Sequence, residues 1–157
     1  MDSTPRSISP AGCGSAAGPF SGVLRGARRP DLVRDEVLAE IFCTSAATRP
    51  DHPALTGPEG TRSYAQVNAE SDAIARGLIR LGIGPGNVVG LWMSRSQALL
   101  IAQIAITKTG AAWLPFDADT PLERIVSCLH DSSARALITS DEFANRAGAT
   151  GVPMFTA

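Results

Sequence analysis

Apolar residues recur at three- and four-residue steps in two early segments of the chain. The first, residues 32–47, carries this spacing through a helix-length run that Pro50 and Pro53 follow. The second begins at Ser63, which with Gln66 forms a capping-box pattern, and stops at Gly82. Such spacing predicts two amphipathic helices, each with one buried face. The predicted apolar residues of the two faces are Val33, Val37, Leu38, Ile41 and Phe42, then Val67, Ser71, Ile74, Ala75, Leu78 and Leu81.

Shorter apolar runs predict strands. Runs at residues 52–55 and 61–64 flank the turn sequence GPEG and predict a hairpin. The nearly continuous apolar run at residues 87–92 is typical of a strand covered on both faces of a parallel sheet. A helix over residues 98–108, opened by Ser94 with Gln97, is apolar almost all round, which predicts deep burial.

The stretch KTGAAWLPFDADTPLER, residues 108–124, predicts a turn, a strand, a loop and a helix entry. The turn falls at Gly110, the strand at residues 111–114, and Pro115 belongs to the loop. Thr120 and Glu123 form a T-x-x-E capping box around a proline at the first helical position. Strands at residues 134–139 and 152–155, and a helix capped by Thr139 and Glu142, follow in the same way. Strands alternating with helices predict an α/β fold with a mostly parallel sheet, flanking helices and a short N-terminal hairpin.

Composition divides the chain into two parts and excludes several classes. Residues 1–30 are rich in Pro, Gly and Ser and are expected to form a flexible leader, with one domain over residues 31–157. The composition of the whole chain, with 44% hydrophobic and 18% charged residues, is that of a globular protein. A net charge of −1 gives no sign of a nucleic-acid-binding surface. No apolar run reaches the ~18 residues of a membrane span, and the N-terminus lacks the apolar core of a secretory signal. Cytoplasmic location is therefore expected.

Cysteine usage indicates neither a disulfide framework nor a zinc site. Cys13, Cys43 and Cys128 are odd in number and widely spaced. The last two fall in helical patterns and are expected to be small residues in or near the core.

Carboxylates provide the first candidate chemistry. Asp117, Asp119 and Glu123 could be metal ligands or an acid/base pair, with Arg124 beside them. Favourable placement near a helix N-terminus explains them better.

The other candidates also favour structural interpretations. Cys128 and His130 are two residues apart on a helix and face different directions, and His52 has no visible partner. The glycines of residues 82–86 follow a helix and precede a strand, so they predict a helix end and turn rather than a dinucleotide loop. Trp92 and Trp113 lie in predicted strands as core or layer-covering aromatics. No catalytic, cofactor-binding or metal-binding residue is assigned.

The order of segments resembles a known family. RPDHPALTGPEGTRSYAQVNAESDAIARGLIRLGIGPGNVVGLWMSRS, then AITKTGAAWLPFDADTPLERI, then CLHDSSARALITS, resembles the start of adenylation domains of the adenylate-forming, AMP-binding superfamily. The closest likeness is to amino-acid-activating domains of nonribosomal peptide synthetases, and AWLPFDADTPLERI suggests the group that resembles poly-lysine synthetase. The fold implied is part of the N-terminal subdomain of such a domain.

This resemblance implies an ATP-dependent ligase that uses Mg²⁺. Its members activate an amino acid or other carboxylic acid as an acyl-adenylate and transfer the acyl group to the phosphopantetheine thiol of a carrier protein. Their phosphate loop, ribose-binding aspartate, acid pocket and catalytic lysine find no counterpart in these residues. The resemblance therefore implies a truncated piece that is inactive and marginally folded alone and binds ATP and Mg²⁺ weakly at best.

Two other interpretations stay open. The chain could be a non-catalytic interaction module, or a split-enzyme subunit that pairs with a chain supplying the rest of the sheet. A phosphate-loop sequence in the downstream DNA would favour truncation. A small unrelated nucleotide-binding domain is disfavoured, because no loop has the glycine-rich strand-to-helix context.

Overall fold

The structure, a computed structural model, describes residues 26–33 and 35–156 and divides into two units, Met1–Arg34 and Asp35–Ala157. Within the first unit the described residues form one short 3-10 helix, η1, Pro30–Leu32. Arg29 Nη2 donates to Asp31 Oδ2 at 2.6 Å, and this interaction lowers the pKa of the Asp31 carboxyl. Most of the predicted leader, residues 1–25, lies outside the described residues. The division of the chain at residue 30 stays a prediction.

A parallel four-stranded sheet organises the second unit. The strand order is β4-β3-β5-β6, with β3 at Val88–Trp92, β4 at Ala112–Phe116, β5 at Ala136–Thr139 and β6 at Met154–Thr156. All three pairings are parallel, as the alternation of strands and helices predicts. The predicted fold class is confirmed.

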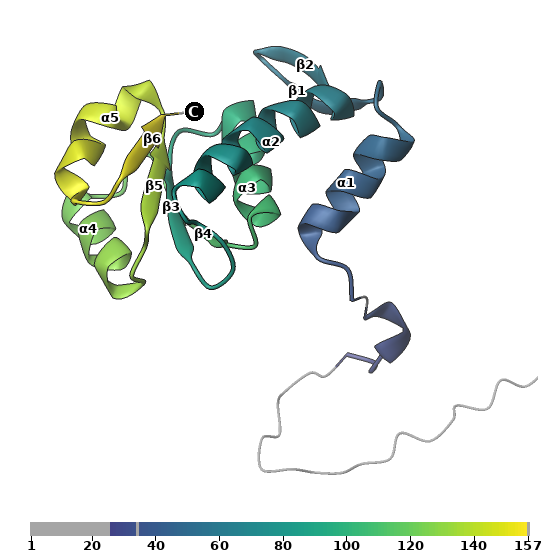
Figure 1. Cartoon of the computed structure of the whole chain (residues 1–157), viewed down its shortest axis with the longest axis horizontal. Helices are drawn as coiled ribbons and strands as arrows, with labels where there is room; N and C mark the ends of the chain where they lie inside the picture. The colour runs from purple at the N-terminus through teal and green to yellow at the C-terminus, as the bar shows by residue number, and fades with distance from the viewer. Residues whose placement is uncertain (1–25, 34, 157) are drawn as a thin grey trace, which may run out of the picture. The chain divides into compact units, whose positions relative to one another are not determined.

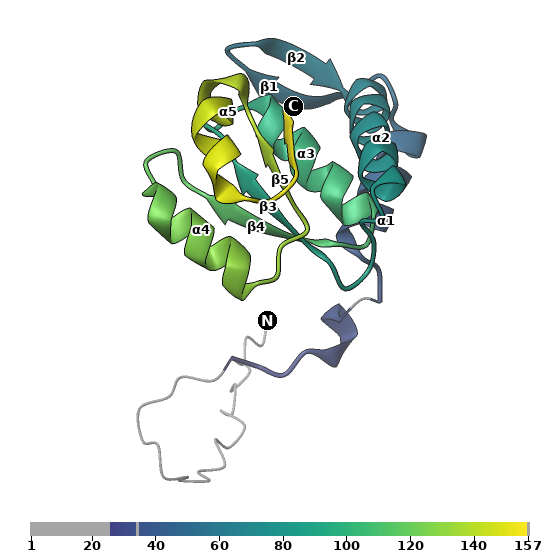
Figure 2. The same ribbon diagram turned by 60° about the vertical axis from the view of Figure 1, so that its left-hand side comes forward.

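Helices cover both faces of this sheet (Figures 1 and 2). On one face lie α2, Tyr64–Arg80, and α3, Gln97–Lys108; on the other lie α4, Leu122–Asp131, and α5, Asp141–Ala147. A 3-10 turn, η2, Gly148–Thr150, follows α5. The sheet therefore forms the middle layer of a three-layer α/β unit.

Alternate residues of the central strands supply two separate cores. Val89 and Leu91 of β3 pack with the α2 and α3 residues, whereas Trp92 packs with α4 and α5. Ile138 and Leu137 divide in the same way on β5. Successive strand residues point to opposite faces of the sheet, and helices cover both faces. The side chains of such a strand are therefore buried on both faces, which is why the run is apolar without polar interruptions.

The hairpin and the first helix precede the sheet. Strand β1, Pro53–Gly57, pairs antiparallel with β2, Gly60–Ser63, which confirms the predicted hairpin. The Ser63 side chain accepts from the Gln66 backbone N–H, and Gln66 Oε1 accepts from Ser63 N–H at 2.8 Å, so the predicted capping box of α2 is confirmed.

The first helix begins later in the chain than the sequence predicts. Helix α1 spans Leu38–Thr48 rather than residues 32–47. It begins where the Glu40 carboxylate accepts from the Val37 N–H at 3.1 Å. Ile41 of its predicted apolar face is 42% exposed and Leu38 is 57% exposed, whereas Phe42 is half-buried, so only part of that face is buried within the described residues. Leu81 of the second predicted face is 52% exposed, because α2 has already ended at Arg80.

Three other predicted helix caps are wrong. Helix α3 is capped by Ser96, whose hydroxyl accepts from the Leu99 N–H at 3.2 Å, while the Ser94 hydroxyl donates to Glu142. Pro121 is the N-cap of α4 and no side chain caps this helix. At α5 the N-cap is Ser140, because the Thr139 hydroxyl donates instead to the buried Trp92 carbonyl at 2.7 Å. In two cases a tertiary hydrogen bond removed the predicted capping group.

Pro115 belongs to β4 and not to the loop after it. Among the described strands β4 pairs with β3 alone and lies at the edge of the sheet, where a proline without an N–H is tolerated. Gly82 and Gly110 both adopt positive φ, 77° and 78°, at the ends of α2 and α3, which confirms the predicted turns. Cys43 is exposed, contrary to prediction, and Cys128 is half-buried; Cys13 lies outside the described residues.

Candidate functional site

The carboxyl ends of the four parallel strands meet at one edge of the sheet. From β3 the chain moves to β4 on one side, and from β4 it crosses back to β5 on the other side of β3. The direction of winding therefore reverses at β3. In open α/β sheets, ligands bind beyond the carboxyl ends of the strands at such a switch point.

A cleft of about 530 Å³ opens beside this switch point. It is formed by the segments that follow β3 and β4, together with the start of α3. Its apolar wall includes Met93, Leu99 and Phe116, and its charged groups are Arg95, Asp117 and Asp119. Apolar walls with a few polar groups are typical of small-molecule sites. We call this hollow the β3–β4 cleft.

A hydrogen bond and aromatic contacts hold the wall of the β3–β4 cleft in place. Trp92 is fully buried, and its indole N–H donates to the Asp117 carbonyl at 3.2 Å. Its ring stacks on Phe143 with centroids 5.0 Å apart, and the Arg146 guanidinium lies 4.7 Å from the ring centroid. The last residue of β3 thus positions the first residue after β4.

Only part of the carboxylate cluster predicted from the sequence is brought to this cleft. Asp117 and Asp119 line it, whereas Glu123 lies in the first turn of α4 and does not. Residues 26–33 and 35–156 contain no group of three or more His, Cys, Asp or Glu side chains that could hold a metal ion. A three-carboxylate metal site is therefore not formed by these residues.

The sulfur and imidazole candidates remain apart. The His130 side chain is 89% exposed, with Nδ1 3.5 Å from an Asp131 oxygen, while Cys128 is half-buried on the same helix. His52 Nδ1 lies 3.2 Å from its neighbour's carbonyl, that of Pro53. Trp92 is a core residue, as predicted, and Trp113 is 38% exposed. These positions give no nucleophile and base within hydrogen-bonding distance.

The connections between strand and helix carry no glycine. They are residues 93–96 after β3, residues 117–121 after β4 and Ser140 after β5. Phosphate-binding loops need glycines there so that backbone N–H groups can approach the phosphate closely. The described strand-to-helix connections thus provide one wall for a ligand but no glycine-rich phosphate-binding loop.

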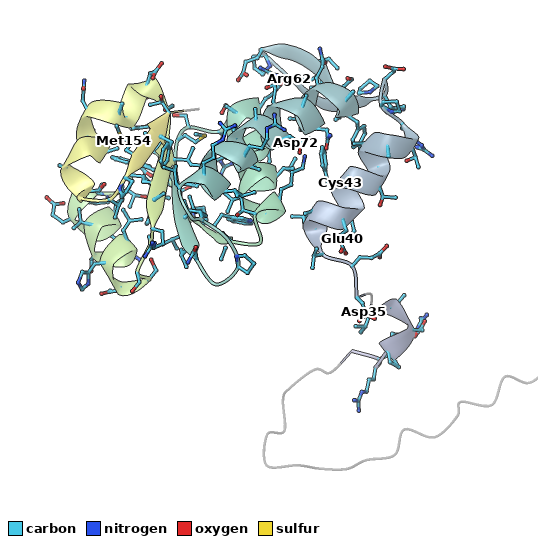
Figure 3. All side chains as sticks on the ribbon, viewed as in Figure 1. Asp35, Glu40, Cys43, Arg62, Asp72 and Met154 are labelled. Carbon is cyan, nitrogen blue, oxygen red and sulfur yellow. The ribbon has the colours of Figure 1, made fainter. Side chains whose placement is uncertain are left out.

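The sequence analysis missed a buried lysine cluster on the α2–α3 side of the sheet. Lys108 Nζ donates to Asp72 Oδ1 at 2.6 Å, Asn68 Oδ1 at 2.8 Å and Ser71 Oγ at 2.9 Å. Asp72 is labelled in Figure 3. The Lys108 side chain is only 8% exposed and its ammonium group lies 5.4 Å from the Phe42 ring centroid. With its three donors occupied, this lysine fixes α3 against α2 and does not serve as a free base.

A signal for this cluster was present in the sequence. Ser71 is a polar residue within the predicted apolar stripe of α2, and a buried hydroxyl needs a partner. The hydroxyl donates locally to the Val67 carbonyl at 2.7 Å, and its oxygen also accepts from Lys108, 37 positions away at the end of α3, which no local pattern identifies.

Comparisons with known proteins agree with this architecture. A family model described as AMP-binding enzyme matches residues 42–154. Delta-poly-L-ornithine synthetase of Acinetobacter baumannii is 46% identical over 121 residues, which are 77% of this chain and 9% of that protein. Surfactin synthase subunit 1 of Bacillus subtilis is 31% identical over 71% of this chain and 3% of its own length. The chain therefore spans about a tenth or less of these two curated relatives.

Solved structures show the same fold. The crystal structure of the nonribosomal peptide synthetase FmoA3 with alpha-methyl-L-serine-AMP bound superposes with a TM-score of 0.71 and 25% identity. The match covers 77% of this chain and 14% of that one. VinN in complex with L-aspartate has the same TM-score at 18% identity, with 77% of this chain and 32% of its own covered. None of the helices in the described ranges has the length and apolar character that crossing a membrane requires.

The family model matches most of the chain, residues 42–154, and the parallel sheet lies within that match. This chain therefore belongs to the AMP-binding enzyme family.

Proposed function

We propose that this chain supplies the N-terminal scaffold of an adenylation domain of the nonribosomal peptide synthetase kind. Such a domain uses ATP and Mg²⁺ to convert an amino acid into an acyl-adenylate, which then passes to a carrier-protein thiol. The observation that carries the proposal is the 46% identity to Delta-poly-L-ornithine synthetase over 121 residues of this chain. The likeness to FmoA3, whose structure holds an aminoacyl adenylate, supports the same class.

The described residues contribute positioning rather than chemistry in this proposal. The β3–β4 cleft provides Arg95 and two carboxylates at the edge where α/β sheets bind ligands. Adenylyl transfer depends on groups that fix the phosphates and stabilise developing charge. Because the strand-to-helix connections lack glycine, we expect the 157-residue chain by itself to form no acyl-adenylate.

The direct test is a chimera. The 121 matched residues of the Acinetobacter Delta-poly-L-ornithine synthetase are replaced by the corresponding residues of this chain. Amino-acid-dependent exchange of pyrophosphate into ATP is then measured for the parent, the chimera and the isolated chain, with L-ornithine among the amino acids tested. The proposal predicts exchange by the chimera and none by the isolated chain.

Two outcomes would contradict it. A chimera that folds but shows no exchange with any amino acid would mean that these residues cannot serve as an adenylation scaffold. Exchange by the isolated chain would mean that the chemistry resides in the 157 residues after all. The expected cytoplasmic location stays a prediction, which this assay does not test.

A non-catalytic interaction module or split subunit is the second candidate. The observation that favours it is the exposed edge of β6, whose outer side has no strand partner in the described chain.

A further inference from the structure

The Gln97 side chain is buried, and both ends of its amide reach the N-terminal hairpin. Gln97 is the first residue of α3, and only 5% of it is exposed. Its Nε2 donates to the Gly60 carbonyl at 2.7 Å, and its Oε1 accepts from the Arg62 guanidinium. Both partners lie in β2, 37 and 35 positions earlier in the chain. Because a buried amide needs partners for both its donor and its acceptor, this side chain fastens the hairpin to the beginning of α3.

The hairpin side of this link is held by further contacts. Arg62, which is labelled in Figure 3, donates from Nε to Glu70 of α2 at 3.2 Å, and its Nη1 lies 3.6 Å from Glu59 Oε2 in the turn. A Cβ at Gly57 would lie 3.4 Å from Gln97 Nε2, so the backbone of the hairpin approaches the amide closely. The link therefore joins three elements, which are the hairpin, α2 and the start of α3.

The other side of the link is the β3–β4 cleft. Residues 93–96 connect β3 to α3, and Gln97 follows them directly. Within this connection the Ser94 hydroxyl donates to Glu142 of α5 at 3.1 Å. Arg95 is the next residue, and it lines the cleft. Its backbone thus lies between two positions that are each fixed by a residue far away in the chain.

The charge of Arg95 is available for a ligand. The residue is exposed, and its guanidinium forms no hydrogen bond or ion pair with residues 35–156. A guanidinium binds the oxygens of phosphate and carboxylate groups through paired N–H donors. Both substrates of the proposed reaction carry such a group, since ATP has a triphosphate and an amino acid has a carboxylate.

We propose that Gln97 is a positioning residue of the β3–β4 cleft. It fixes the start of α3 against the hairpin, so that the Arg95 guanidinium meets an anionic group of the substrate. Gln97 itself touches no substrate and acts through Arg95. This inference rests on the proposed function for its kinetic test, whereas the coupling between the hairpin and the cleft is measured on the chain itself.

Three variants separate positioning from stability. Gln97→Met keeps the length of the side chain and removes both hydrogen bonds to the hairpin. Gln97→Glu keeps an acceptor for Arg62 and loses only the donor to Gly60. Lys108→Met is the matched control, because it removes charged hydrogen bonds at the opposite end of the same helix and does not line the cleft.

The kinetic test uses the chimera with Delta-poly-L-ornithine synthetase, in which kcat and KM are measured by pyrophosphate exchange at varied ATP and varied amino acid. Misplacing a binding group by about 1 Å costs up to about a hundredfold, so we expect Gln97→Met to lower kcat/KM by roughly ten- to a hundredfold. Gln97→Glu should retain more activity, and Lys108→Met should retain that of the chimera. A raised KM for ATP identifies the triphosphate as the partner of Arg95, and a raised KM for the amino acid identifies the carboxylate.

A double variant tests whether Gln97 acts through Arg95. Arg95→Ala should lower kcat/KM at least as much as Gln97→Met does. Adding Gln97→Met to Arg95→Ala should then cause no further loss, whereas a purely structural role of Gln97 predicts losses that add.

Hydrogen exchange of the full 157-residue chain supplies the second readout. Gln97→Met should speed exchange in β2 and in the first turn of α3, and Lys108→Met should not. If the chimera is active but Gln97→Met and Lys108→Met lower kcat/KM equally, or if the losses of Gln97→Met and Arg95→Ala add, this inference is refuted and the proposed function stands. An inactive chimera would refute the proposed function. Exchange then decides the positioning role, which unchanged rates in Gln97→Met would overturn.

Discussion

Gly90 lies at the middle of β3, where the sheet has no room for a side chain. A Cβ at this position would lie 2.6 Å from Leu129 Cδ2 and 2.9 Å from Leu137 Cδ1. Contacts between carbon atoms are optimal at about 3.5–4.0 Å. Gly90→Ala therefore requires both leucines to move by roughly 1 Å, yet they are 1% and 0% exposed in a close-packed core.

The cost follows from two opposing terms. Overpacking a core by one methyl group costs about 1–3 kcal/mol. Replacing a strand glycine by alanine recovers about 0.5–1 kcal/mol of backbone entropy. We expect a net loss of about 1–2 kcal/mol in the free energy of unfolding. In urea this lowers the midpoint by about 1 M, because the m-value of a small domain is about 1–3 kcal/mol/M.

The assay is urea unfolding of the full chain, followed by tryptophan fluorescence. Gly77→Ala is the matched control, because Gly77 lies within α2 and no atom lies within 4 Å of its would-be Cβ. That change should stabilise the protein by about 0.5–1 kcal/mol. If Gly90→Ala were as stable as the parent while Gly77→Ala gained stability, the packing of Leu129 and Leu137 over β3 would be refuted.

Two further pairs of variants test the helix caps and the buried lysine. Ser63→Ala should destabilise the chain by about 1 kcal/mol, because the Ser63 hydroxyl caps α2. Thr120→Ala should change stability by less than about 0.5 kcal/mol, because no side chain caps α4. Equal losses of stability in thermal unfolding would contradict this assignment of the caps. Lys108→Met should cost about 1.5–3 kcal/mol, since it removes charged hydrogen bonds between α3 and α2. A double-mutant cycle with Asp72→Asn should show coupling between the two residues, and additive effects would mean that their 2.6 Å contact contributes nothing.

Patterns that local physics controls could be predicted from the sequence. The apolar run of β3 and the period of two that divides Val89 from Trp92 follow from burial on both faces. The Ser63 capping box and the turn at Gly82 depend only on neighbouring residues, and both were predicted. The parallel sheet follows from the alternation of these elements.

What the sequence did not predict depends on residues far apart in the chain. Thr139 could not cap α5 because its hydroxyl reaches the Trp92 carbonyl, 47 positions away. Ser94 likewise could not be recognised as a partner of Glu142, because the two residues are 48 positions apart. Of the candidate carboxylates, only Asp117 and Asp119 reach the β3–β4 cleft, because α4 begins at Leu122 and carries Glu123 outside it. Tertiary contacts decide such cases, and a single sequence contains no local record of them.

The most direct test of the central claim is amide hydrogen exchange on the purified chain. If residues 35–156 form the family's parallel sheet, the amides of β3 and β5 lie between paired strands and under helices on both faces. They should exchange only through global unfolding and be the slowest in the protein. The β6 amides at the open edge should exchange faster. Slow exchange in β3 and β5 is the predicted result, whereas rapid exchange throughout the chain would show that the sheet does not form and would contradict the account.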